Sequence, residues 1–185
     1  MDIKLRNMNN LQGEMNIPMK MERVWAMPNK WTFSILPIER LLLEELGGIP
    51  KDNVIDPYAG KNGSKYADHI NDLAHGGIDA LDYLRQWPNE VFDVVILDPP
   101  YSLRQVSEHY KKAGIKITGW HTSSGYNSAL KNEAARILKC SGKVICFGWN
   151  SMGLGKNRGF EMTRILLVPH GGSKNDTIVT VERKL

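Results

Sequence analysis

At 185 residues, with 42% hydrophobic and 24% charged residues, the chain has the length and composition of one globular domain with a substantial core. Its two cysteines lack the paired spacing of a disulfide framework or a zinc site, and no apolar run is long enough to span a membrane. The amino terminus lacks the apolar segment of a signal peptide, so we expect a reducing, cytoplasmic setting and no membrane partner.

Charge is distributed unevenly along the sequence. The net charge is only +4. Residues 41–100 contain 4 Lys or Arg against 11 Asp or Glu, whereas residues 101–160 contain 10 against 2. Such an asymmetry indicates a polyanionic partner, although a solvated basic face accounts for the same counts equally well.

The first half of the chain predicts one helix and several short strands. Residues 1–30 are polar and rich in methionine without a sustained period, so we expect an N-terminal extension that is partly disordered or wraps around the domain. Residues 38–46 ("IERLLLEEL") have the spacing of an amphipathic helix, which two glycines end. Short strands are predicted in "NVIDPYAG" (53–60) and "KYADHIND" (65–72), and "IDALDYLRQW" (78–87) predicts a strand end that runs into a helix.

The second half begins with the strongest strand, "VFDVVILD" (91–98), which is apolar nearly throughout, as a parallel strand covered on both faces should be. A helix is predicted over 127–139 and another buried strand over 143–149. The last two strand patterns, 160–170 and 176–185, flank "GGSKN" and predict an antiparallel pair that closes the sheet.

Strands that alternate with helices predict an α/β fold, a doubly wound and mostly parallel sheet with helices on both faces. In such sheets, ligands lie outside the carboxyl ends of the strands. Two Asp-Pro turns, Asp56-Pro57 and Asp98-Pro99, come at the ends of predicted strands. Proline cannot continue a central strand because it lacks an N–H group. Both turns are therefore expected at the same edge of the sheet.

The residues Asp98-Pro99-Pro100-Tyr101 match the motif of enzymes that methylate amino groups, which is an acidic or amide residue, two prolines and an aromatic residue. With the buried strand before it and the upstream loop "DPYAG" (56–60), the chain resembles the S-adenosylmethionine-dependent DNA amino-methyltransferases, especially small adenine-specific ones of phages and prophages. The resemblance covers residues 30–183. It implies that residues 31–185 form a single Rossmann-like methyltransferase domain, closed by the C-terminal antiparallel hairpin and without a separate target-recognition domain.

The chemistry of this reaction accounts for the residue types in the motif. The lone pair of an exocyclic amino group is delocalised into the base, which makes the nitrogen a poor nucleophile. Asp98 and the Pro99 carbonyl can accept its two N–H groups and aim the lone pair at the methyl carbon, and Pro100 stiffens the turn. Tyr101 offers a ring on which a base extruded from the duplex can stack. We therefore expect methyl transfer to the N6 amino group of adenine in DNA.

The resemblance also implies a site for S-adenosylmethionine and no metal. Asp56 would lie at the methionine amino group, Asp72 (or else Asp68) at the ribose hydroxyls, and Asp79 at the adenine amino group. Gly60 would let the backbone approach the ligand closely, although the second glycine of the family's loop is displaced in "DPYAGKNG". The cofactor-binding candidates are Thr32, Phe33, Pro37, Asp56, Pro57, Tyr58, Gly60, Asp72, Asp79 and Ala80.

The basic half of the chain is expected to hold the DNA. Residues 102–126 and 150–159 are predicted to be loops after strands that end on the catalytic edge, where both would flank the extruded base of a double-stranded substrate. The candidate DNA-binding residues are Arg104, Lys111, Lys112, Lys116, Lys156 and Arg158. Without a recognition domain, target recognition would fall to loops, a homodimer or a partner subunit.

Four other functions are alternatives to adenine methylation. An Asp at the first motif position favours adenine over the N4 of cytosine, where Ser is typical, and methylation of an RNA base stays open because it uses the same loop chemistry. Methyl transfer to a protein glutamine is disfavoured because that family has Asn in place of Asp98. An inactive cofactor- or DNA-binding module would explain the displaced glycine, but the intact Asp98 and Tyr101 oppose it.

Overall fold

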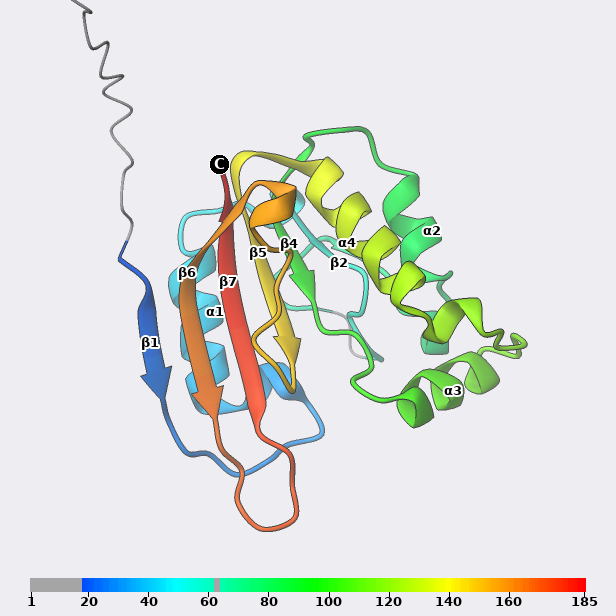
Figure 1. Cartoon of the computed structure of the whole chain (residues 1–185), viewed down its shortest axis with the longest axis horizontal. Coiled ribbons are helices and arrows are strands. Elements are labelled where there is room, and N and C mark those ends of the chain that lie inside the picture. Colours follow the sequence, from blue (N-terminus) through cyan, green and yellow to red (C-terminus); the bar gives the residue numbers. More distant parts are fainter. Residues whose placement is uncertain (1–17, 62–63) are drawn as a thin grey trace, which may run out of the picture.

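The computed structural model describes residues 18–61 and 64–185, which form a seven-stranded sheet with helices on both faces (Figure 1). The strands are β1 (Lys20–Arg23), β2 (Val54–Asp56), β3 (His69–Ile70), β4 (Phe92–Leu97), β5 (Leu138–Gly148), β6 (Phe160–Val168) and β7 (Thr177–Lys184). The α-helices are α1 (Leu36–Leu46), α2 (Ala80–Arg85), α3 (Leu103–Lys112) and α4 (Ser124–Ile137). None of the helices in these two ranges is both long and apolar enough to span a membrane.

The strand order is β1-β6-β7-β5-β4-β2-β3, and β7 alone runs against its neighbours β5 and β6. The predicted mostly parallel α/β sheet and its C-terminal antiparallel pair are thus confirmed. The hairpin does not end the sheet, however, because β1 pairs in parallel with β6 and forms the edge beyond it. Most β1 side chains are exposed, so the sequence carries no apolar pattern that would reveal this strand.

β1 comes from the predicted N-terminal extension, of which residues 1–17 lie outside the described residues. The chain after β1 stays attached to the β6–β7 hairpin. The N–H of Ala26 donates to the carbonyl of Pro169 at 3.2 Å, and the Ala26 carbonyl lies 2.9 Å from Nδ1 of His170. β1 therefore belongs to the sheet, and Ala26 after it lies at the carboxyl end of β6.

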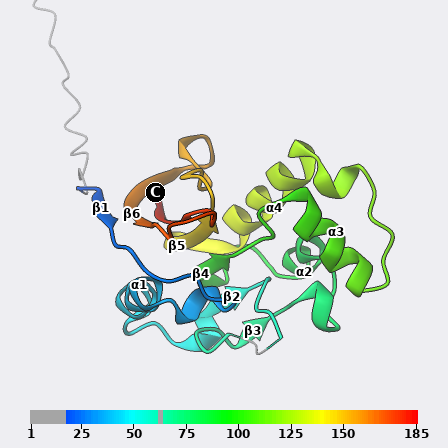
Figure 2. The same cartoon turned by 90° about the horizontal axis from the view of Figure 1, so that it is seen from below.

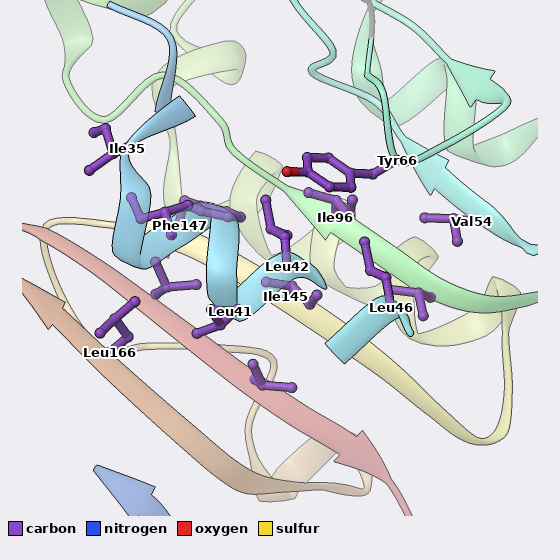
Figure 3. Packing of buried hydrophobic residues seen from close by; sticks show 14 of the residues in the cluster. Ile35, Leu41, Leu42, Leu46, Val54, Tyr66, Ile96, Ile145, Phe147 and Leu166 are labelled. Carbon is purple, nitrogen blue, oxygen red and sulfur yellow. The ribbon is translucent and has the colours of Figure 1, made fainter. Parts of the chain in front are cut away.

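The core has two layers, one on each face of the sheet. On one face, α1 packs its apolar side against the strands, with Leu41, Leu42 and Leu46 over β4, β5 and β7 (Figure 3). On the other face, α2 and α4 cover a second cluster. In β4, Val94 and Ile96 belong to the first cluster and Val95 and Leu97 to the second. This central strand is buried on both faces, as its apolar sequence predicts.

The prediction of a loop over residues 102–126 is wrong, because α3 fills Leu103–Lys112 and α4 already begins at Ser124. Leu103, Val106 and Tyr110 share one face of α3, but only Tyr110 is buried, and the prediction of a loop overlooked this short apolar stripe. A second signal was also present. Ser102 and Gln105 form a capping box, the reciprocal side-chain-to-backbone pairing that starts helices.

Three predicted boundaries also need correction. The strand expected over 65–72 is reduced to β3, and the strand end expected near residue 78 is absent, since Asp79 there caps α2. Helix α4 ends at Ile137 rather than at residue 139, because β5 starts directly at Leu138. These changes leave the order of elements unaltered.

Candidate active site

Both Asp-Pro turns lie at the carboxyl edge of the sheet, as predicted. Asp56 is the last residue of β2, and Asp98 directly follows β4, its parallel neighbour. Figure 2 looks onto this edge from below, with α1 on one side of the sheet and α2 and α4 on the other. The two turns therefore open into the same space.

A cleft of about 680 Å³ lies at this edge, between the segment before α1, the loop after β2 and the turn after β4. Its volume lies within the range of small-molecule sites, about 300–1,000 Å³. The sequence-predicted residues that line it are Thr32, Phe33, Tyr58, Gly60, Asp72, Asp98, Pro99, Pro100 and Tyr101. Residues 32–33 and 98–101, which are more than 60 residues apart in the sequence, thus line the same cleft.

The Asp98–Tyr101 turn is closed on itself by hydrogen bonds. The Tyr101 hydroxyl donates to the Asp98 carboxylate, which also accepts from the side chain of Thr32. Burial raises the pKa of Asp98 to about 6, against the opposing effect of these two donors. On the other side of the turn, the N–H of Tyr101 donates to Oε1 of Gln105 at 2.7 Å. The capping of α3 therefore fixes the backbone of the turn.

Asp56 is fully buried at the end of β2 and does not itself line the cleft, although its neighbour Tyr58 does. One of its oxygens accepts the N–H of Tyr58 at 3.0 Å, and the other, Oδ2, has no hydrogen-bond partner among the described residues. Burial raises the pKa of Asp56 to about 7, and the charge of Asp98 adds to this rise. A buried carboxylate with an unpaired oxygen matches a cationic group placed beside it.

Asp72 lines the cleft, whereas Asp68 does not. Asp72 follows β3 and accepts the N–H of Gly60 at 3.0 Å. Asp68 precedes β3, so it lies toward the amino edge of the sheet, where its side chain is exposed. The structure thus favours Asp72 over Asp68 as the carboxylate at the cofactor cleft. Gly60 has a φ of 69°, a left-handed conformation that suits glycine.

Asp79 and Ala80 line a second cavity together with Pro57, next to the main cleft. This cavity measures about 50 Å³, far below the volume of a ligand site. Asp79 caps α2 by accepting the N–H of Leu81 at 2.9 Å. Its other oxygen, Oδ2, accepts from the hydroxyls of Tyr110 and Tyr126, the latter at 2.9 Å. Neither tyrosine could be predicted from the sequence, because Asp79 lies more than 30 residues away from both.

Helix α3 is held to this edge by contacts with two of the candidate cofactor carboxylates. Tyr110 reaches Asp79, and Nζ of Lys112 lies 2.7 Å from Nε2 of His75. Nδ1 of His75 in turn lies 2.7 Å from Asp72. Because an ammonium group can only donate, Nε2 accepts from Lys112 and Nδ1–H donates to Asp72. Pro37, another predicted cofactor-binding residue, lies in the first turn of α1 and does not line the cleft.

The predicted DNA-binding residues fall at two opposite edges. Arg104, Lys111 and Lys112 lie on α3 at the catalytic edge, and Lys116 follows them. Lys156 and Arg158 directly precede β6, which runs parallel to β5 across β7, so they lie at the amino ends of these strands. The expectation that both basic segments flank the catalytic turn is therefore wrong for Lys156 and Arg158.

Arg158 also has a structural role at that opposite edge. Its guanidinium donates to Asn132 at 2.7 Å and to Ser128 at 2.9 Å, and both of these residues belong to α4. The loop before β6 is thereby tied to the helix. This contact accounts for Arg158 without any ligand.

The fold of the chain is similar to that of a solved structure. TrmN from Thermus thermophilus matches with a TM-score of 0.50 and 20% sequence identity, over 82% of this chain and 49% of that one. HI0767 from Haemophilus influenzae, a proposed methylase, matches with a TM-score of 0.45 and 15% identity, over 80% of this chain and 87% of that one. The chain spans about half the length of TrmN. No protein-family model and no curated protein matches the sequence.

The raised pKa of Asp56 predicts a specific dependence of stability on pH. The folded state binds this proton more tightly than the unfolded state, so stability should fall as the pH rises from 5 to 8. Asp56→Asn should reduce the fall by about 2–3 kcal/mol, since one unit of pKa corresponds to about 1.4 kcal/mol. Urea unfolding at the two pH values measures the difference. Asp82→Asn, on the exposed side of α2, is the control and should keep the pH dependence of the parent. The same dependence in Asp56→Asn as in the parent would contradict the assignment.

Proposed function

We propose that the chain transfers a methyl group from S-adenosylmethionine to the N6 amino group of adenine in DNA. The observation that carries the proposal is the Asp98–Tyr101 turn, which presents a carboxylate and an aromatic ring to a cleft of ligand size. Activation of an amino group needs two acceptors for its N–H groups, and the turn offers the Asp98 carboxylate and the Pro99 carbonyl. No covalent nucleophile is required.

The carboxylates of the cleft fit the groups of S-adenosylmethionine. When bound, this cofactor supplies a methyl group made electrophilic by the positive sulfur. Asp56 would accept from the methionine ammonium with its unpaired Oδ2, and the cation would lower the pKa of Asp56 again. Asp72 would accept from the ribose hydroxyls. Thr32 and Phe33, with Tyr58 and Gly60 opposite, would line the pocket.

The adenine end of the cofactor meets a more crowded carboxylate. Asp79 already accepts from the N–H groups of α2 and from two tyrosine hydroxyls. Two carboxylate oxygens offer about four acceptor positions. The adenine amino group would therefore take the place of one tyrosine, and Tyr110, on the peripheral helix α3, is the one with fewer ties to the core.

Asp98 would act on the target base. An ionised carboxylate is the stronger acceptor for an N–H, and a pKa of about 6 leaves Asp98 mostly ionised at neutral pH. The target amino group would replace the Tyr101 hydroxyl as its donor, which frees the Tyr101 ring to stack on the base. This exchange requires a base that has left the duplex stack.

The DNA would lie over α3 and the rim of the cleft. Arg104 is 88% exposed on the first turn of α3, and Lys30, Lys61 and Lys65 line the cleft. Phosphates are expected to follow these cations, because the carboxylates inside the cleft would repel them. A second copy or a partner subunit would supply the target recognition that loops of this size leave incomplete.

The methyl-transfer proposal predicts N6-methyladenine in unmethylated DNA incubated with the protein and S-adenosylmethionine, measured by digestion and nucleoside mass spectrometry. Asp98→Ala should abolish turnover while cofactor affinity stays within a few-fold, since Asp98 acts on the base. Asp82→Ala is the matched control and should keep full activity. Methylated cytosine alone, or methylated RNA beside untouched DNA, would refute the adenine assignment, and an active Asp98→Ala would refute the catalytic one.

The ribose assignment predicts a loss of cofactor affinity at one of two nearby carboxylates. Asp72→Ala should weaken binding of S-adenosylmethionine by about 1.5–3 kcal/mol, the usual cost of losing hydrogen bonds to a charged group. Asp68→Ala removes an equal charge four residues away at the opposite end of β3 and should leave the affinity unchanged. Isothermal titration calorimetry measures both. Equal affinities for Asp72→Ala and the parent would exclude the role.

The placement of DNA predicts how affinity depends on salt. Each phosphate contact lowers log K by about 0.9 per log unit of salt. Replacing Lys111, Lys112 and Lys116 with Ala should therefore flatten the slope by roughly two to three. The control replaces Lys51, Lys139 and Lys156 with Ala. This variant loses the same charge at the opposite edge and should keep the parent slope. If the two triple variants share the parent slope, α3 is only a solvated surface.

A further inference from the structure

We propose that Trp149 is a second aromatic wall of the site that receives the target base, so that the base lies in the corner between Trp149 and Tyr101. This inference rests on the proposed function, because it needs a base at the catalytic turn. Tyr101 was expected from the sequence to be the stacking ring. Trp149 adds a residue from a different strand.

Sheet register places Trp149 beside the catalytic turn. Leu97 of β4 pairs with Cys146 of β5, so the residues that leave the two strands next do so at the same level of the sheet. Trp149 directly follows β5. The centroids of the Trp149 and Tyr101 rings are 5.7 Å apart, and the ring planes meet at 64°. This edge-to-face arrangement is a favourable one for two aromatic rings.

Because the ring planes of Tyr101 and Trp149 meet at 64°, the two rings form two sides of a corner. A planar base that stacks on one ring would present its edge to the other, which repeats the same favourable edge-to-face geometry. Without a base, the hydroxyl of Tyr101 donates to the Asp98 carboxylate, so this ring pair lies beside the group proposed to accept the amino N–H. Base-stacking and amino-group positioning would thus be combined in one place.

Trp149 is 43% exposed, and the loop that it begins is anchored further along, at residues 153–155. The N–H groups of Leu154 and Gly155 donate to the carboxylate of Glu182, which is 2% exposed on β7. Nζ of Lys131 donates to the carbonyl of Gly153 at 2.6 Å. A Cβ at Gly153 would meet the Glu182 carboxylate at 2.0 Å, so this close approach requires glycine. Exposed apolar area costs about 25 cal/mol per Å², and an anchored loop that keeps a tryptophan exposed is therefore suited to a stacking partner.

The test is steady-state methylation of unmethylated plasmid DNA by the full chain, with Trp149→Leu and Trp149→Phe as variants. Stacking contributes about 1–3 kcal/mol per base, so Trp149→Leu should raise KM for DNA about tenfold or more. Trp149→Phe keeps a flat ring and should restore most of the loss. Trp25→Leu, a 59% exposed tryptophan beside the β6–β7 hairpin, is the control and should match the parent.

Two further measurements separate stacking from mere support of Tyr101. Calorimetry with S-adenosylmethionine and the thermal unfolding midpoint should be the same for all three variants and the parent. A lower midpoint with reduced kcat and unchanged KM in Trp149→Leu would overturn the inference, and so would parent-like kinetics. An inactive parent on every nucleic acid would instead refute the proposed function itself.

Discussion

The gathering of four carboxylates at one partly buried edge of the sheet is the constraint on which the rest of the site depends. Burial in a medium of low polarity raises the pKa of a carboxyl group, and a neighbouring like charge adds to the rise, unless hydrogen-bond donors compensate. The compensating donors come from distant segments: Thr32 and Tyr101 for Asp98, Gly60 and His75 for Asp72, and Tyr110 and Tyr126 for Asp79. Oδ2 of Asp56 has no hydrogen-bond partner among the described residues, and burial raises the pKa of Asp56 to about 7. A cationic group beside Asp56 would supply the missing partner.

Helix α3 depends directly on this constraint. It buries Tyr110, whereas Leu103 on the same face is largely exposed, so hydrophobic packing contributes only part of what holds it in position. Its ties to the body run through Tyr110 to Asp79 and through Lys112 and His75 to Asp72. A ligand that takes up these carboxylates competes with the same ties. The basic helix α3 and the candidate cofactor carboxylates thus share hydrogen bonds.

The sequence predicted those features that follow from burial and from local chemistry. β4 is apolar on both faces and ends at two prolines, so its existence, its central place and the turn after it could all be read from residues 91–101. β1 and α3 could not be found by the same route, because most side chains of both elements face solvent. The opposite placement of Lys156 depends on β6 running parallel to β5 with β7 between them, and this non-local pairing leaves no mark in residues 150–159. The partners of Asp79 were hidden for the same reason.

The antiparallel strand β7 does more than complete the sheet. By lying between β5 and β6, it places the buried Glu182 beside Val144 of β5, underneath the loop that leaves that strand. Two backbone N–H groups of the loop end on this carboxylate, and Gly153 packs against it without a side chain. The conformation of the loop is therefore set from the half of the sheet that carries no candidate cofactor residue. A parallel strand in the place of β7 would pair with β5 in a different register, so another residue would lie beneath the loop. The C-terminal hairpin thus holds residues 153–155, the far end of the loop that begins at Trp149, where the Trp149 ring contacts Tyr101 at the end of β4.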